Sequence, residues 1–177
     1  DVVAALAAGA SCVVVDDSSL PRDTSYFHVD NALQALQDMA SFHRRSLGVP
    51  VIAITGSNGK TTTKELAASV LSEKFRVTAT KGNLNNHIGV PLTLLSVPAD
   101  AELIIVEMGA NHCGEIAALC EIAAPTYGLI TNVGKAHLEG FGSFEGVKKA
   151  KGELYEYLLR HEGEIFICAD NAELLAM

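Results

Sequence analysis

The hydrophobic residues of this chain follow two periodicities that take turns along the sequence. Short runs of consecutive apolar residues, typical of strands buried on both faces, alternate with longer segments in which apolar residues recur at helical spacing. The expected strands are 51–55, 75–79, 103–107, 127–131 and 164–168, and the expected helices are about 60–73, 114–123 and 144–160. Strands that alternate with helices in this order predict an α/β fold with a doubly wound, mostly parallel sheet.

The amino-terminal part has its own short pattern. An apolar helical segment over 2–8 is followed by a strand over 12–15. Asp30 is a good N-cap for the next helix, which ends where Gly, Val and Pro follow one another. We therefore expect a remnant of a small α/β domain over 1–24 and a main domain over 25–177, both cut from a longer protein.

Composition narrows the class of protein. Apolar residues make up 49% of the chain, and no run reaches the roughly 18 apolar residues that a membrane helix needs. The apolar start has no basic region before it, so the sequence predicts neither a membrane span nor a secretory signal. The net charge of −8, from 13 basic and 21 acidic residues, argues against a nucleic-acid partner.

The cysteines suggest a compartment rather than a site. Their spacing lacks the short intervals that build a zinc site. We expect buried, reduced thiols in a cytoplasmic protein at all four positions, Cys12, Cys113, Cys120 and Cys168.

The strongest functional motif is a glycine-flanked loop between the strand at 51–55 and the helix that follows it. Its glycines let the backbone curl so that successive N–H groups point at one anion, and the first helical turn adds unpaired donors. Lys60 is placed to neutralise nucleotide phosphates, and Thr61 to offer its hydroxyl to Mg²⁺. The strict Walker A pattern has glycine where this chain has Ile54, so a plain strand-to-helix turn stays open as the alternative. The predicted residues for the phosphates of ATP are Gly56, Ser57, Asn58, Gly59, Lys60, Thr61 and Thr62.

Two further strands end at residues suited to metal or acid–base chemistry. Glu107 closes the strand at 103–107, where a carboxylate ligand for Mg²⁺ belongs, although a solvent-exposed acid at a strand end is the alternative. His137 lies in the loop after the strand at 127–131, and a lone histidine there is more often a surface or hydrogen-bonded structural residue.

Two polar segments are open to more than one interpretation. The amide-rich loop at 81–87 is suited equally to contacting a polar ligand and to forming a turn. The helix over 144–160 carries lysines and glutamates that by default form a solvated charged face. These are Glu145, Lys148, Lys149, Lys151, Glu153 and Glu156.

Taken together, these motifs resemble the Mur ligase family, which forms amide bonds at the expense of ATP in bacterial peptidoglycan synthesis. The family's phosphate loop is similar to residues 55–62, which accounts for the missing Walker A glycine. Residues 83–95 and 107–116 are similar to the member that adds D-alanyl-D-alanine. The resemblance covers most of the chain and implies a P-loop NTPase-like central domain, here truncated, with no carboxyl-terminal domain.

The resemblance also implies roles for single residues. Lys60 is expected to contact the terminal phosphates, and Thr61 with Glu107 to hold a first Mg²⁺. His137 is expected to help hold a second, faced by Lys151, which in this family is often carbamylated. The implied substrate-contacting residues are Asn83, Asn85, Asn86, His87, Asn111 and His112.

The implied activity is ATP-dependent addition of D-alanyl-D-alanine to UDP-N-acetylmuramoyl tripeptide through an acyl phosphate. We expect the isolated chain to be inactive, because closure of a further domain must complete the site. Three alternatives stay open: another ligase of the Mur or folylpolyglutamate synthase kind, a nucleotide-binding module without ligation, and a purely structural domain.

Overall fold

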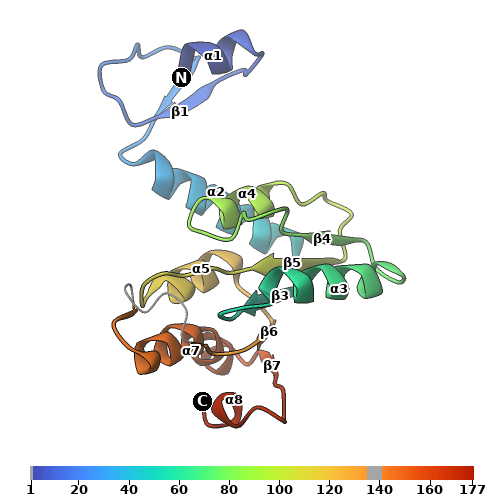
Figure 1. The fold of residues 1–177 in the computed structure, drawn as a ribbon. Helices are drawn as coiled ribbons and strands as arrows, with labels where there is room; N and C mark the ends of the chain where they lie inside the picture. Colours follow the sequence, from blue (N-terminus) through green and yellow to red (C-terminus); the bar gives the residue numbers. More distant parts are fainter. Residues whose placement is uncertain (1, 135–140) are drawn as a thin grey trace.

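A five-stranded parallel sheet forms the centre of the main domain (Figure 1). The computed structural model describes residues 2–134 and 141–177. Across the sheet the strand order is β4-β5-β3-β6-β7, so β3, which leads into the phosphate loop, lies in the middle. The strands are β3 (Val51–Thr55), β4 (Val77–Ala79), β5 (Leu103–Glu107), β6 (Tyr127–Ile130) and β7 (Glu164–Phe166). All neighbouring pairs are parallel, which confirms the expected α/β class.

Helices cover both faces of this sheet. One face packs on α4 (Gly89–Leu95), α5 (Glu115–Ala123) and α7 (Phe144–Arg160), with α2 (Ala32–Leu47) packed against α4 and α5. The other face packs on α3 (Lys60–Ser72), which lies over β4, β5 and β3. Beyond α3, that face bears a cavity of 340 Å³ between Ile52, Tyr127 and Phe166, and Phe166 is 52% exposed.

A small unit precedes the main domain and lies apart from the sheet in Figure 1. It contains α1 (Val2–Ala7) and a parallel pair of short strands, β1 (Val13–Val15) and β2 (Tyr26–His28). Because β2 pairs with β1, the hydrogen-bonded unit extends past residue 24, where the sequence suggested a boundary. The helix α2 runs from this unit to the main domain (Figure 1).

The ends of several expected elements differ from the sequence prediction. The N-cap of α2 is Asn31 rather than Asp30, because the side-chain oxygen of Asn31 accepts a hydrogen bond from the N–H of Gln34 at 2.9 Å. The edge strands β4 and β7 are shorter than expected, since each pairs with one neighbour over only three residues. The sequence analysis missed β2, α4 and the terminal helix α8 (Ala172–Leu175).

The expectation of four buried thiols was wrong. Cys120 is buried within α5, and burial raises its pKa to about 12. The other three thiols are free and exposed, because they lie outside the helices and strands that form the core; they are Cys12, Cys113 and Cys168. Among the described residues, no helix has the length and apolar character needed to cross a membrane.

Candidate functional site

The phosphate loop needs both of its glycines. Gly56 has a φ of 142°, and a side chain there would collide with the hydroxyl of Thr131 and lie 3.1 Å from its backbone nitrogen. Gly59, the N-cap of α3, has a φ of 78°, in the left-handed region that favours glycine. The N–H of Thr63 donates to the carbonyl of Gly59 at 2.9 Å. The N–H groups of residues 60–62 precede that bond and point out of the first helical turn.

The loop is attached to the segment after β6. The N–H groups of Ser57 and Asn58 donate to the backbone and side-chain oxygens of Asn132, both at 3.0 Å. The Thr131 hydroxyl donates to the carbonyl of Asn58 at 2.6 Å, and the N–H of Gly134 donates to the Ser57 hydroxyl at 2.9 Å. The N–H groups of Ser57 and Asn58, which were expected to face an anion, therefore bond to protein. The N–H groups of the first turn of α3 are left to face the anion.

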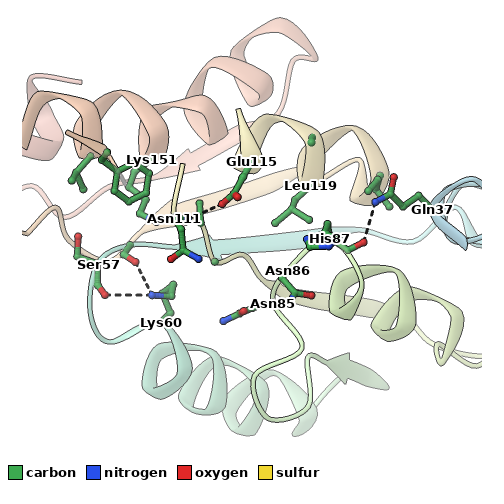
Figure 2. A pocket seen from close by; sticks show the side chains of 17 residues that line it. Gln37, Ser57, Lys60, Asn85, Asn86, His87, Asn111, Glu115, Leu119 and Lys151 are labelled. Carbon is green, nitrogen blue, oxygen red and sulfur yellow. Dashed lines mark hydrogen bonds between the residues drawn. The ribbon is translucent and has the colours of Figure 1, made fainter. Parts of the chain in front are cut away.

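The ammonium group of Lys60 lies over the loop. Its Nζ donates to the carbonyl of Gly56 at 2.8 Å and to that of Ser57 at 3.4 Å (Figure 2). Burial lowers the pKa of Lys60, and the negative charge of Glu107 partly opposes that shift. Lys60 is thus a half-buried cation held by carbonyl oxygens within the cavity wall.

The carboxylate of Glu107 joins the phosphate loop to the 81–87 loop. Glu107 ends β5 and is only 1% exposed. Its Oε2 accepts the Thr61 hydroxyl at 2.9 Å, and its Oε1 accepts the side-chain amide of Asn85 at 2.8 Å. Its N–H donates to the hydroxyl of Thr80 at 2.9 Å. The alternative of a solvent-exposed acid was therefore wrong for Glu107.

Lys151 supplies a second cation from α7. The residue is 2% exposed, and its Nζ lies 5.5 Å from the ring centroid of Phe141. Burial lowers the pKa of Lys151 to about 8; the nearby charge of Lys60 adds to this shift, and Glu115 and Glu153 oppose it. Among the described residues, no hydrogen bond or ion pair engages its Nζ. The burial of Lys151 excludes the solvated surface charge that the helix pattern alone suggests.

Glu153, two residues after Lys151 on α7, is also buried rather than part of a solvated charged face. It is 9% exposed, and its two oxygens accept the N–H groups of Gly114 and Ala117 at 2.6 and 2.9 Å. Lys148, by contrast, pairs with the exposed Glu173 at 2.8 Å.

Lys60 and Lys151 both line one cavity of 530 Å³ (Figure 2). The phosphate loop, the 81–87 loop, the segment after β5 and α7 each contribute to its wall. Of the candidate residues, those that line it are Gly56, Ser57, Lys60, Asn85, Asn86, His87, Asn111 and Lys151. The 81–87 loop is anchored from α2, where the side-chain amide of Gln37 donates to the carbonyl of His87 at 3.0 Å.

Other candidates lie around this cavity or outside the described chain. Thr61 and Glu107 meet at the start of α3, and neither lines the cavity. Asn58, Gly59, Thr62 and Asn83 are exposed and do not line it. His112 is exposed and pairs with Glu115 at 3.3 Å. His137 lies outside the described residues.

Sequence reasoning missed several residues that shape the site. Glu115 lines the cavity, and its Oε2 accepts the N–H groups of Asn111 and His112 at 2.7 and 3.2 Å. Asn132 holds the phosphate loop, as described above. Asn132 lies directly after a predicted strand, and Glu115 lies at the start of a predicted helix. These positions were the only sequence signal that could have pointed to a role in the site.

Comparison with known proteins identifies the family. Residues 54–177 match the family model described as the Mur ligase middle domain. The chain belongs to the Mur ligase family. This Mur ligase chain is 46% identical over 176 residues to UDP-N-acetylmuramoyl-tripeptide--D-alanyl-D-alanine ligase from Synechocystis sp., covering 97% of this chain and 38% of the relative.

Solved structures of Mur ligases share the fold. A structure of UDP-N-acetylmuramoylalanyl-D-glutamyl-2,6-diaminopimelate--D-alanyl-D-alanyl ligase from Acinetobacter baumannii aligns with a TM-score of 0.85 at 35% identity, covering 98% of this chain and 38% of that one. The MurF ligase from Thermotoga maritima in complex with ADP aligns with a TM-score of 0.80 at 36% identity, covering 86% of this chain and 36% of that one. The chain therefore spans well under half the length of these relatives.

Proposed function

We propose that this chain is the nucleotide-binding part of an ATP-dependent ligase that joins D-alanyl-D-alanine to UDP-N-acetylmuramoyl tripeptide. The names of the relatives support this activity, and the ADP complex of the Thermotoga maritima ligase supports a nucleotide site. We also propose that the chain divides into a small unit, which its strand pairing extends from residue 24 to the end of β2, and a nucleotide-binding domain that follows it. ATP is a cytoplasmic metabolite, so the proposal places the reaction in the cytoplasm.

One observation carries the proposal: the Thr61 hydroxyl and the Glu107 carboxylate meet at 2.9 Å at the start of α3. A hydroxyl and a carboxylate oxygen are the hard donors that Mg²⁺ prefers, together with phosphate oxygens and water. The Asn85 amide occupies Oε1 of Glu107 and leaves Oε2 to turn from Thr61 to a cation. These residues therefore fit a magnesium ion, which when bound neutralises phosphate charge.

Lys60 is also expected to neutralise charge on the phosphates. Its ammonium is held by two carbonyls that have no net charge, so a polyphosphate competes for it at little cost. A carboxylate is a poor electrophile, and ATP supplies the phosphoryl group that converts it to an acyl phosphate before the dipeptide amine attacks. Bringing two anions together requires fixed positive charge, which Lys60 contributes.

Lys151 faces the same cavity with different chemistry. With a pKa of about 8, it holds more neutral amine at neutral pH than an ordinary lysine. We propose that this amine adds to carbon dioxide, forming an N–C bond and releasing a proton. The product, a carbamate, is negatively charged where the lysine ammonium was positively charged. Its oxygens could bind a second cation, for which His137 is the other proposed ligand.

The remaining candidates are assigned to the acceptor peptide. We propose that Asn85, Asn86, His87 and Asn111, which line the cavity, contact the end that reacts. The residues Asn83 and His112, exposed beyond the cavity, are assigned to the outer part of the UDP-linked substrate.

Titration of Mg·ATP into the 177-residue chain tests the nucleotide site. We expect binding by the unchanged chain, loss of at least about tenfold in affinity in Lys60→Ala, and no change in Lys149→Ala, an exposed lysine on α7. Equal binding by all three proteins would place the nucleotide elsewhere. Ligation is tested in a longer protein that contains these residues: ATP binding without dipeptide-dependent phosphate release would favour a nucleotide-binding module instead.

A further inference from the structure

The short helix α5 is held at both ends by charged side chains from other helices. At its carboxyl end, Nε and Nη2 of the buried Arg44 in α2 donate to the carbonyls of Ala123 and Ala124 at 2.8 and 2.9 Å. At its amino end, the N-cap is Gly114, which has no side chain to accept a hydrogen bond. Glu153 of α7 takes that place through the N–H groups of Gly114 and Ala117.

The carboxylate of Glu153 suits this position physically. A helix exposes unpaired N–H groups and partial positive charge at its amino end, so an anion there is stabilised. Two charge-assisted hydrogen bonds offset the cost of burying the carboxylate at 9% exposure. Since α7 and α5 pack together, this contact fixes the amino end of α5 against α7.

The contact extends to the cavity wall. The first residue of α5 is Glu115, which lines the cavity and accepts the N–H groups of Asn111 and His112. The segment that presents Asn111 is therefore folded onto the same helical turn that Glu153 holds. Lys151 lies on α7 two residues before Glu153, and it lines the same cavity as Asn111 and Glu115 (Figure 2).

The phosphate loop is held by a separate set of hydrogen bonds. Its contacts run to Thr131, Asn132 and Gly134, after β6, and none of the described hydrogen bonds joins it to Glu153 or to residues 109–115. The cavity therefore has two walls, each with its own set of hydrogen bonds, and the path between them runs through Glu107 and Asn85, whose carbonyl accepts the N–H of Gly109 at 2.8 Å.

We propose that Glu153 is a positioning residue: it holds Asn111 and Glu115 against Lys151 and so sets the acceptor-facing wall of the cavity. The assignment of that wall to the acceptor rests on the proposed function. Glu153 itself touches no reacting group; it acts through the amino-terminal turn of α5.

Nuclear magnetic resonance of the ¹⁵N-labelled 177-residue chain tests the proposal. In Glu153→Ala we expect amide hydrogen exchange at Gly114 and Ala117 to become about tenfold faster, with a comparable increase at Asn111 and His112. Amides of β3 are expected to exchange at an unchanged rate. Glu153→Gln keeps one side-chain oxygen as an acceptor and is expected to restore part of the protection.

The matched control is Glu156→Gln, which removes an exposed carboxylate from the same helix. Acceleration confined to Gly114 and Ala117 would overturn the proposal, because Glu153 would then cap a helix without setting the wall. Unchanged exchange in both Glu153 variants would also overturn it. If Glu153→Ala does not fold, Glu153→Gln decides, through the amide proton shifts of Gly114 and Asn111 relative to the unchanged chain.

Mg·ADP binding separates this test from the proposed function. We expect the same affinity in Glu153→Gln as in the unchanged chain, because the phosphate loop has its own contacts. Failure of the unchanged chain to bind Mg·ADP would count against the nucleotide site, while the exchange rates would still decide the role of Glu153. A matching loss of affinity in Glu153→Gln would contradict the proposal that Glu153 sets only the acceptor-facing wall.

Discussion

The chemistry of Lys151 depends strongly on its surroundings. Burial and the charge of Lys60 lower its pKa from the ordinary 10.5 to about 8. Between these two values the unfolded chain binds more protons at this position than the folded chain. The contribution of Lys151 to the free energy of unfolding therefore rises as the pH increases from about 8 to 10.5.

The titration of Lys151 can be measured directly. In the metal-free chain we expect its side-chain carbon resonance to titrate near pH 8. In Lys60→Met the pKa of Lys151 is expected to rise, because a repelling positive charge is removed. Lys149, exposed on the same helix, provides the internal comparison. An unchanged Lys151 titration in the variant would show that the two ammonium groups do not interact.

The proposed role of Glu107 as a magnesium ligand can be tested by substitution. Glu107→Gln keeps an acceptor oxygen for Asn85 or Thr61 but removes the charge that a cation requires. We expect the gain in ADP affinity on adding Mg²⁺ to fall by about tenfold or more, while metal-free ADP binding stays close to that of the unchanged chain. Calorimetric titrations with magnesium and with a chelator measure both values. Retention of the full magnesium effect would exclude Glu107 as a ligand.

Single residues also show how much of the site can be predicted from the sequence. The phosphate loop is a local motif, so its glycines, Lys60 and Thr61 could be proposed from adjacent positions alone. Asn132 and Glu153 were missed because their partners lie far away in sequence, at Asn58 and Gly114. Their roles follow from the packing of elements, which no local pattern specifies.

At the scale of elements, α3 and β4 are joined by a buried lysine. Nζ of Lys64 on α3 donates to the carbonyl of Thr80, directly after β4, at 2.6 Å and pairs with Glu65 at 2.7 Å. The hydroxyl of Thr80 in turn accepts the N–H of Glu107. Lys64 therefore connects the helix of the phosphate loop to the strand ends behind it.

Removal of this connection has a stability cost. In Lys64→Met the carbonyl of Thr80 loses its buried donor, and we expect the free energy of unfolding to fall by about 1–3 kcal/mol. Urea denaturation measures the change, with the exposed Lys74→Met as the control. A loss no larger than that of the control would mean that water or another donor replaces the ammonium.

The elements that the sequence predicted are those with long, regular patterns. The bounds of β3, β5 and α7 agree with the expected ranges. By contrast, β2 and α8 have three and four residues, too few to show a periodicity. The helix α4 was missed as well: it has only seven residues, and Pro91 lies in its first turn, where proline needs no hydrogen-bond donor.

At the scale of the whole molecule, ligand binding and folding are linked. A ligand that binds only the folded chain stabilises it by about 2.7 kcal/mol at a concentration 100 times its Kd. For a chain of this size we expect Mg·ADP at that concentration to raise the Tm by roughly 5–10 °C.

Differential scanning fluorimetry measures this shift. Lys60→Ala at the same Mg·ADP concentration is expected to show a markedly smaller increase, because its affinity is lower. An equal increase in both proteins would indicate a nucleotide site that does not include Lys60.

The central position of β3 has a consequence for synthesis of the chain. Its neighbours β5 and β6 end at Glu107 and Ile130, and Asn132 follows with the oxygens that hold the loop. A strand whose partners are so distant in sequence pairs late during folding, because non-local pairing is slow to form. On the ribosome, we therefore expect the loop to acquire its shape only after Asn132 has left the exit tunnel, well after its own residues have emerged.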